Sequence, residues 1–338
     1  TVESNFITDT SGLTPTLNTG GTYGWHNPAV AAGQELSFTV SLTVPLDITS
    51  GALVTNTVEL TTATVGDDQT NNTASASGRA YQIVPIATAR AGVVGQVFGV
   101  EGSVTYVPGT YNASGWALQD ASGGIGVFYT PTPTVALGDR VRLVATRGAN
   151  AGETQLGSTV RYFNNLGSGP QVTPLPFTTA QVAAGAAEGW LAVVTGTVSG
   201  VPATCTGNQQ FTINDGSGST TIFVDVDTTI NVCNLGIVSG DRVVFTGFGS
   251  QFNGLMEIKP RFPADVKRLF DVTFVYNDLE DAVHVGEDVE WRGDINGWAG
   301  TIMSHDAGYT VFSLTLTQLT TGTVGYKYYV PSLGGNSA

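Results

Sequence analysis

Three side chains near the end of the chain combine groups that suit a sugar. Trp298 follows an Asn-Gly turn, and Lys327 and Tyr329 belong to the run Tyr-Lys-Tyr-Tyr-Val. Residues two apart on a strand share a face, so Lys327 and Tyr329 should face away from Tyr326 and Tyr328. Aromatic rings suit the apolar face of a pyranose, which makes these three residues a candidate carbohydrate platform. The alternative is that Trp298 anchors its turn and the tyrosines fill a core.

A second candidate set lies in the middle of the chain. Arg140 and Arg142 would share one strand face, and rings that could stack on bases occur nearby, at Phe128, Tyr129, Tyr162 and Phe163. Arginines beside stacking rings bind single-stranded nucleic acid. However, residues 81–175 carry five arginines against four acids, and the whole chain has a net charge of −14. A nucleic-acid partner is therefore not expected, and the alternative is exposed strand arginines beside core aromatics.

Oxygen-bearing side chains cluster once, at Asp67, Asp68, Asn71 and Asn72. Carboxylate and amide oxygens suit calcium, although no twelve-residue calcium loop is present. The sequence leaves structural calcium open, a zinc site is not expected because no His lies near the two cysteines, and we expect no organic cofactor. Two other acids, Asp120 and Asp215, are each followed by x-Ser-Gly, a pattern that predicts a turn capped by its own aspartate.

No arrangement of residues predicts catalysis. The histidines, His26, His284 and His305, lie in no nucleophile or metalloprotease motif. The acid pairs Glu280-Asp281 and Glu287-Asp288 are adjacent in sequence, so on a strand their carboxylates point in opposite directions. They cannot form the facing carboxylates of a glycosidase. We therefore predict that the chain is not an enzyme.

Cys205 and Cys233 are the two cysteines of the chain. We expect them to form a disulfide, which would close a loop of about 29 residues and contribute about 3.6 kcal/mol in the chain-entropy model. The alternative is two buried thiols. A disulfide would indicate an oxidising compartment.

The elements that position these residues are short and extended. Charged residues make up only 12% of the 338, glycine occurs 44 times, and lysine occurs three times. Alternating runs at 36–44 and 191–198 lie between Gly, Asn, Asp and Pro clusters, which predicts many half-buried strands. Helical periodicity is weak, and the best candidate is 179–188. No run of 18 apolar residues occurs, so no membrane span is expected.

The middle of the chain contains an internal repeat. Residues 118–128 align with 213–223, and Gly-Asp-Arg-Val occurs at 138–141 and again at 240–243. Asn253-Gly254 is a strong signal for a two-residue hairpin turn. The repeat predicts a duplicated domain. We expect domains at 1–80, 81–175, 176–270 and 271–338, with linkers at 78–82, 167–176 and 267–271.

Three resemblances cover parts of the chain. The first 80 residues resemble the later part of an Ig-like repeat of bacterial surface proteins, through Trp25 and the segments 32–40, 54–60 and 67–75. The two copies resemble the OB-type barrels that accompany secreted bacterial nucleases, through their Asp-x-Ser-Gly turns, their Gly-Asp-Arg-Val strands and the segment 260–265. That likeness implies an accessory role, with the catalytic domain elsewhere.

The last segment resembles a starch- or glycogen-binding β-sandwich. The likeness rests on 289–298, which ends in Asn-Gly-Trp, and on 326–330. It implies that Trp298 stacks on a sugar and that Lys327 bonds its hydroxyls. The first and last modules both lack strands that complete members of these families contain, so we expect them to be incomplete.

Together these observations predict an all-β protein. The expected fold is a multi-domain string: a β-sandwich, two OB-like Greek-key barrels and a terminal Ig-like β-sandwich. We expect an extracellular or cell-surface structural or adhesive protein, part of a fibre, sheath, surface layer or large adhesin. Its partners would be further copies of itself or neighbouring surface subunits. The alternatives are an accessory region of a secreted nuclease and a polysaccharide-binding module.

Overall fold

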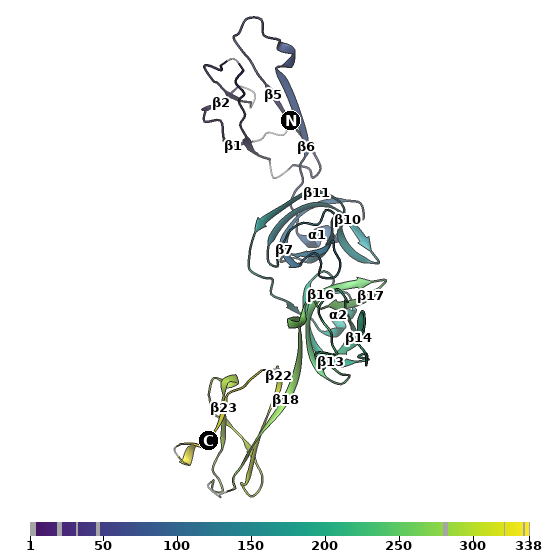
Figure 1. Cartoon of the computed structure of the whole chain (residues 1–338), viewed down its shortest axis with the longest axis vertical. Helices are drawn as coiled ribbons and strands as arrows, with labels where there is room; N and C mark the ends of the chain where they lie inside the picture. Colours follow the sequence, from purple (N-terminus) through teal and green to yellow (C-terminus); the bar gives the residue numbers. More distant parts are fainter. Residues whose placement is uncertain are drawn as a thin grey trace.

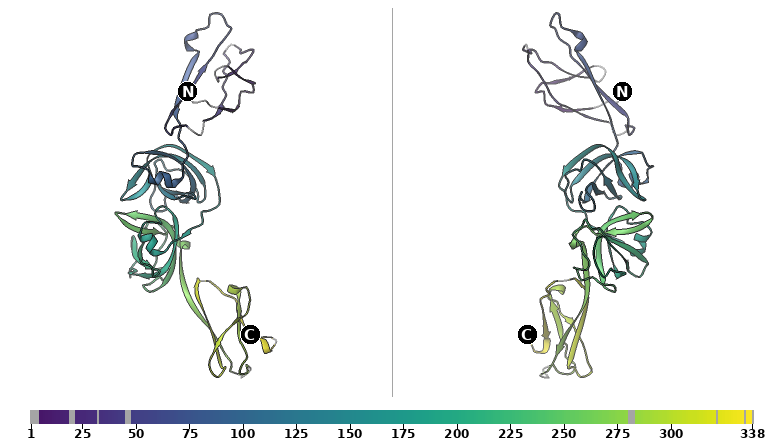
Figure 2. Two further views of the ribbon diagram at one scale, coloured as in Figure 1. Left: turned by 180° about the vertical axis from the view of Figure 1, so that it is seen from behind. Right: turned by 45° about the vertical axis from the view of Figure 1, so that its right-hand side comes forward.

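The computed structural model describes residues 5–18, 22–31, 33–44, 48–279, 283–320, 322–333 and 335–337. The molecule is elongated, with the N-terminal strands at one tip, two barrels in the middle and the last module at the other tip (Figures 1 and 2). Nearly all of the regular structure is β-strand, as the sequence predicts.

The described residues of the first module, 5–80, form three separate two-stranded antiparallel ladders. These are β1 (Asn5–Asp9) with β4 (Val40–Thr43), β2 (Pro15–Leu17) with β3 (Tyr23–Trp25), and β5 (Leu53–Glu59) with β6 (Thr73–Arg79), with a 3-10 turn η1 (Gln69–Asn71) before β6. The three hydrophobic core clusters contain no described residue of this segment. The strand expected over 36–44 is shorter and begins at Val40, because residues 36–39 are exposed and pair with no described strand, although Thr39 bonds to Thr10 just past β1.

The first barrel closes five strands in the order β10-β11-β9-β8-β7. They are β7 (Val97–Tyr106), β8 (Gly115–Gln119), β9 (Gly124–Phe128), β10 (Arg140–Asn150) and β11 (Glu153–Gly167). β9 and β11 pair in parallel, and the other pairs are antiparallel. The core includes Trp116, Leu118 and Leu143, all fully buried. The helix α1 (Ile86–Ala91) precedes the barrel, and the sequence analysis missed it because six residues are too few to show a helical period.

The second barrel repeats this topology. Its strands are β13 (Leu191–Ser199), β14 (Gln209–Asn214), β15 (Ser219–Val224), β16 (Arg242–Phe252) and β17 (Leu255–Lys259), and β13 closes on β16. β15 and β17 form the parallel pair. A two-residue strand β12 (Leu175–Pro176) and a short helix α2 (Thr179–Ala183) precede β13, so the helix predicted over 179–188 is present but shorter. Both copies are therefore closed, five-stranded, Greek-key barrels.

The repeated aspartates hold equivalent places in the two barrels. Asp120 accepts from the backbone N–H of Ser122 in its own turn and also from that of Ile86, at the start of α1. Asp215 does the same with Ser217 and with Thr179, at the start of α2. The predicted turn caps are thus confirmed, and each also ties the β-hairpin to the helix that precedes its barrel.

One strand, β18 (Val266–Asn277), belongs to both the second barrel and the last module. It pairs with β16 through 266–269 and with β22 (Val311–Thr320) through 269–277. The segment 267–271, expected to be a linker, therefore lies inside a continuous strand, because β16 pairs with its first part and β22 with the rest, across a register shift between Phe270 and Val272. A 3-10 turn η2 (Pro263–Asp265) leads into β18, and β21 (Ser304–His305) lies on the far side of β22.

A second sheet completes the module in the order β20-β19-β23-β24. Its strands are β19 (Glu290–Gly293), β20 (Thr301–Ile302), β23 (Tyr326–Val330) and β24 (Gly335–Ser337), with 3-10 turns η3 (Asp294–Asn296) and η4 (Pro331–Leu333). The core between the two sheets includes Phe274, Trp291 and Phe312.

Candidate functional site

The structure brings Trp298, Lys327 and Tyr329 to one face of the last module. The Nζ atom of Lys327 lies 5.8 Å from the ring centroid of Trp298. Lys327 pairs in register with Arg292, whose Cζ atom lies 4.1 Å from the ring centroid of Tyr329. Arg292 in turn forms an ion pair with Glu290 at 2.6 Å. The result is a polar face of two cations, one carboxylate and two aromatic rings.

The neighbouring tyrosines face the other way, as predicted. The ring of Tyr326 lies 4.7 Å from that of Phe274, and the ring of Tyr328 lies 5.3 Å from that of Tyr276, both centroid to centroid. Trp298 lies just past η3 with a φ of 65°, and its backbone N–H donates to the carbonyl oxygen of Gly293 at 2.9 Å. Its side chain keeps 44% of its surface exposed, so the indole is fixed at its base and open to solvent.

Sequence reasoning missed Arg292 in this set. Arg292 alternates with Trp291 on β19, so the burial of Trp291 in the core sends Arg292 to the outer face. The alternation in the Glu-Trp-Arg-Gly run could have placed Arg292 on the outer face. Only the pairing with β23 shows that Arg292 lies over Tyr329.

Arg140 and Arg142 lie together on the first barrel, and both pair with Glu101 on β7. Because two guanidinium groups surround it, the pKa of Glu101 lies below its usual value. Two of the nearby rings are also engaged: Phe163 packs edge-on against Trp116 and is stacked with Tyr129. Phe128 and Tyr162 remain nearly half exposed. The arginine pair therefore presents less free charge than its sequence suggests.

The face of the first barrel that β8 and β9 form is buried. OB barrels bind oligonucleotides and oligosaccharides on the face of their second and third strands, which here are β8 and β9. All of β8 is buried, and β9 is buried from Gly124 to Val127, so neither strand shows the exposed alternate positions seen on β14. The second barrel covers this face.

Glycines allow the close contact between the barrels. A Cβ atom on Gly124 would overlap the carbonyl oxygen of Gly189 in the second barrel, and the reverse is also true. Copy two has Ser219 at the position that matches Gly124, and Thr221 at the position that matches Gly126. The repeat is thus asymmetric at the positions where the first copy meets the second.

Polar bonds also cross this interface. Gln119 accepts from the N–H of Leu191 at 2.8 Å, and Arg90 pairs with Glu188 at 3.1 Å. Tyr111 donates its hydroxyl to the carbonyl of Lys259, and Arg261 donates to the carbonyl of Thr105 at 2.7 Å. These contacts lie around the apolar pair of Tyr106 and Phe248, whose ring centroids are 5.0 Å apart.

A cluster of charged groups is buried at the same interface. Ser250 Oγ donates to Glu153 Oε2 at 2.5 Å, and Lys259 pairs with Asp225 at 3.3 Å. Burial raises the pKa of Glu153, and it raises the pKa of Glu257 to about 7. The charge of Lys259 lowers both pKa values, whereas Glu188 raises the pKa of Glu153, and Glu153 and Asp225 raise that of Glu257.

The predicted disulfide is present. Cys205, in the β13–β14 loop, is bonded to Cys233, in the β15–β16 loop, with their Cα atoms 5.9 Å apart. Cys233 lies between Asp215 and Asp241, a stretch that is seven residues longer than its counterpart between Asp120 and Asp139 in the first copy. The bond is of the kind that forms in an oxidising compartment.

The candidate calcium ligands are engaged with their own turn. Asp68 accepts from the N–H and the hydroxyl of Thr70, and Asp67 accepts from the side chains of Gln69 and Asn72. The bonds from Thr70 hold the pKa of Asp68 below its usual value. No three His, Cys, Asp or Glu side chains in the described ranges group together so as to hold a metal ion.

Two of the histidines considered for catalysis have local contacts in the structure. Glu287 accepts from the N–H of His284 at 2.9 Å, and the ring of His305 is stacked on Tyr309 at 3.8 Å. Glu280 and Asp281 lie outside the described residues. None of the helices in the described part of the chain has the length and apolarity needed to cross a bilayer.

Comparison with known proteins adds little to this description. No protein-family model matches the chain, and no curated protein matches it. One similar solved structure, described as "Structural mimicry for functional antagonism", is 10% identical, with a TM-score of 0.28. The alignment covers 51% of this chain and 95% of that one. At that TM-score the likeness carries no argument about function.

Proposed function

We propose that this chain is a non-catalytic structural segment of an extracellular or cell-surface protein, and that its barrels and last module act as a stiff spacer. One observation carries the proposal: the second barrel is joined to each neighbour by ordered contacts. It covers the β8–β9 face of the first barrel, and its β16 ladder runs on through β18 into the last module.

Small-angle X-ray scattering tests the stiffness. A matched comparator carries a Gly-Ser-Gly-Ser insertion between Leu269 and Phe270, which interrupts β18 where it passes from β16 to β22. The unmodified chain should scatter as a rigid elongated particle, and the insertion should increase its apparent flexibility. If both chains scatter alike as flexible strings of modules, the spacer proposal fails.

The adhesive part of the proposal rests on the first module. It leaves large apolar side chains exposed, among them Leu53, Val58 and Leu60 on or next to β5. The β5–β6 ladder also has unpaired outer edges among the described strands, and such edges accept strands from other chains. We propose that neighbouring subunits, or further copies of this chain, cover these side chains. A monodisperse monomer in light scattering at high concentration would argue against self-association.

Polysaccharide binding is a second candidate, favoured by the convergence of Trp298, Lys327 and Tyr329 on one exposed face. Titration with maltoheptaose should change the tryptophan fluorescence, and Trp298→Ala and Lys327→Gln should each weaken binding. Lys267→Gln is the matched control, because Lys267 is an exposed strand lysine outside this face. An unchanged fluorescence signal would remove this candidate.

An accessory role beside the catalytic domain of a secreted nuclease is the third candidate function. The tandem closed barrels are the observation that supports it, while the covered β8–β9 face weighs against nucleic-acid binding by the first barrel. The complete reading frame that encodes this chain would decide the matter by showing a catalytic domain or none.

A further inference from the structure

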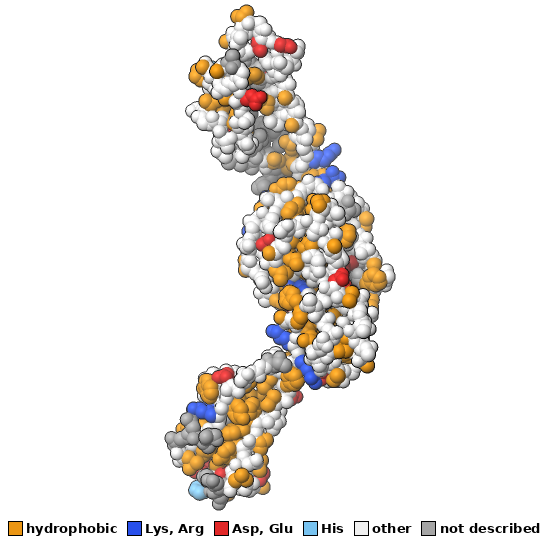
Figure 3. Space-filling view, in the orientation of Figure 1, with side chains coloured by type: hydrophobic (Ala, Val, Ile, Leu, Met, Phe, Trp, Pro, Cys, Tyr) orange, Lys and Arg blue, Asp and Glu red, His pale blue; other side chains and the backbone are white. Residues whose placement is uncertain are grey.

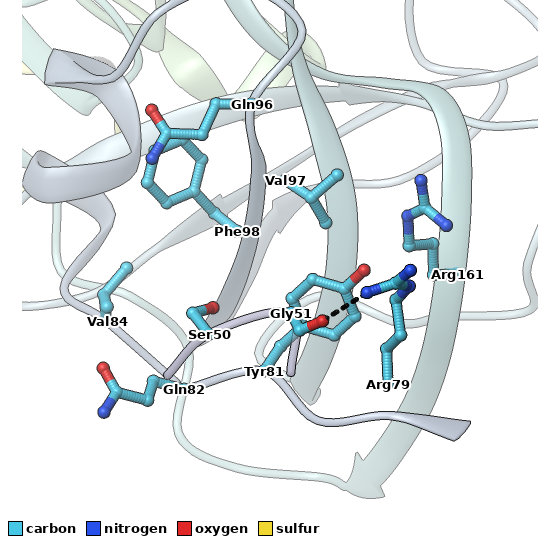
Figure 4. A pocket seen from close by; sticks show the side chains of 10 residues that line it. All are labelled: Ser50, Gly51, Arg79, Tyr81, Gln82, Val84, Gln96, Val97, Phe98 and Arg161. Carbon is cyan, nitrogen blue, oxygen red and sulfur yellow. Dashed lines mark hydrogen bonds between the residues drawn. The ribbon is translucent and has the colours of Figure 1, made fainter. Parts of the chain in front are cut away.

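A hollow of about 590 Å³ lies where the first module meets the first barrel. Figure 4 shows its lining. Ser50, Gly51 and Arg79 come from the first module, Tyr81 comes from the connection, and Gln96 and Arg161 come from the barrel. Its volume is in the range of sites that hold small ligands, and such sites favour domain junctions.

The two arginines of this hollow differ from most others in the chain. Six of the ten arginines pair with a carboxylate, whereas no described carboxylate forms an ion pair with Arg79 or Arg161. Both side chains are exposed. Figure 3 shows basic side chains gathered at this junction. In a chain with a net charge of −14, two such guanidinium groups in one hollow mark a local site for an anion.

One of the guanidinium groups is already fixed. Arg79 Nη1 donates to the carbonyl of Gly51 at 2.7 Å, the bond drawn in Figure 4. A guanidinium group has five N–H donors, so this bond leaves Arg79 others to direct at a ligand. Fixing the group in advance reduces the entropy lost on binding, and the fork of N–H groups matches a carboxylate.

The other residues that line the hollow indicate which class of molecule bears the anionic group. The phenol of Tyr81, the hydroxyl of Ser50 and the amide of Gln96 are groups that hydrogen-bond sugar hydroxyls, and the ring of Tyr81 can face a pyranose. We propose that this hollow binds an acidic polysaccharide, with the carboxylate of one uronic acid between Arg79 and Arg161. The inference is independent of the spacer proposal, because it concerns a ligand and not the stiffness of the chain.

Isothermal titration calorimetry at low salt tests the proposal, with oligogalacturonate as the probe. Arg79→Gln combined with Arg161→Gln should weaken binding about tenfold or more, since each charge-assisted pair contributes strongly. Arg161→Gln alone, which keeps the bond from Arg79 to Gly51, should weaken it by a smaller factor. Arg242→Gln is the matched control, because Arg242 is an exposed strand arginine of the second barrel with no described carboxylate partner. It should leave the affinity nearly unchanged.

Three results would overturn the proposal. If Arg242→Gln weakened oligogalacturonate binding as much as the double variant does, the attraction would come from diffuse charge and not from this site. Equal affinity for maltoheptaose would show that the carboxylate is not recognised, and equal affinity for a poly-glutamate peptide would show that the sugar is not. Thermal unfolding of each variant, compared with the parent chain, verifies that the modules remain folded.

Discussion

Ser250 of the second barrel donates its hydroxyl to the buried carboxylate of Glu153 in the first. The bond lies beside a second buried carboxylate, Glu257, so the interface holds two acids where the outer faces of two OB-like barrels meet. Burial raises the pKa of both carboxyl groups, so each favours its protonated form more than a free glutamate does.

We predict that the chain becomes less stable as the pH rises from about 4.5 to about 7. The pKa of Glu257 is raised from 4.5 to about 7 by burial, so in this range the folded state keeps a proton that the unfolded state has lost. The loss should be about 2 kcal/mol, because nearby solvent reduces the full effect of the shift. Urea unfolding at a series of pH values measures it. Glu257→Gln should flatten the dependence of the unfolding free energy on pH. Glu59→Gln, at an exposed position of β5, is the control and should leave it unchanged. A Glu257→Gln profile as steep as that of the parent chain would contradict the assignment.

The opposite dependence is predicted for Asp215. Hydrogen bonds from Ser217 and Thr179 hold its pKa well below the usual 3.8, so the stability that it adds is present above that pH and is lost as the pH falls further. Asp215→Ala should cost about 1 to 2 kcal/mol at neutral pH, through the loss of the bonds from Thr179 at the start of α2 and of the turn bonds from Ser217. Chemical unfolding measures this cost. Asp227→Ala, at an exposed position of the same barrel, is the control; an equal cost there would contradict the capping role.

The barrel interface should not tolerate a side chain at Gly124. Gly124→Ala would place its Cβ atom against the backbone of Gly189, so either the barrels move apart or the fold is destabilised by about 1 to 3 kcal/mol. Gly123→Ala is the neighbouring control, because its Cβ atom would meet its nearest neighbour at an ordinary 3.4 Å. Thermal unfolding and limited proteolysis between the barrels would detect the difference, and identical behaviour of the two variants would disprove the close contact.

Reduction should weaken the second barrel. Removing the bond between Cys205 and Cys233, by a reducing agent or by the double change to serine, should lower the free energy of unfolding by about 3.6 kcal/mol on the chain-entropy model. Denaturant unfolding with and without reductant measures this. The double-serine variant should not respond to reductant, and a response would point to an effect other than this disulfide.

Local patterns predicted much of this fold, and long-range pairing explains what they missed. Asn253 and Gly254 both have positive φ, as the hairpin signal requires, and the repeat correctly indicated two like domains. By contrast, residues 36–39 alternate but pair with none of the strands that the structure describes, and 267–271 lies inside a strand because β16 and β22 each pair with part of β18. No local pattern shows such partners.

In the candidate sites, too, some residues are placed by local patterns and others by long-range contacts. Lys327 and Tyr329 share a face because alternation along one strand sets their directions, which is visible in sequence, whereas Trp298 reaches them only through the pairing of β19 with β23. The roles of Gly124 and Glu153 are different, since each depends on a residue about 65 to 97 positions away. Arg79 and Arg161 likewise meet only across a domain junction.

The continuity of β18 has a mechanical consequence. A pull on the two tips of the molecule would load the β16–β18 and β18–β22 ladders along their length, so many hydrogen bonds would resist together. Between β6 and α1, by contrast, the load would pass through the single connection of residues 80–85 and the few contacts beside it. Under tension this connection should extend first, while the second barrel and the last module stretch as one body.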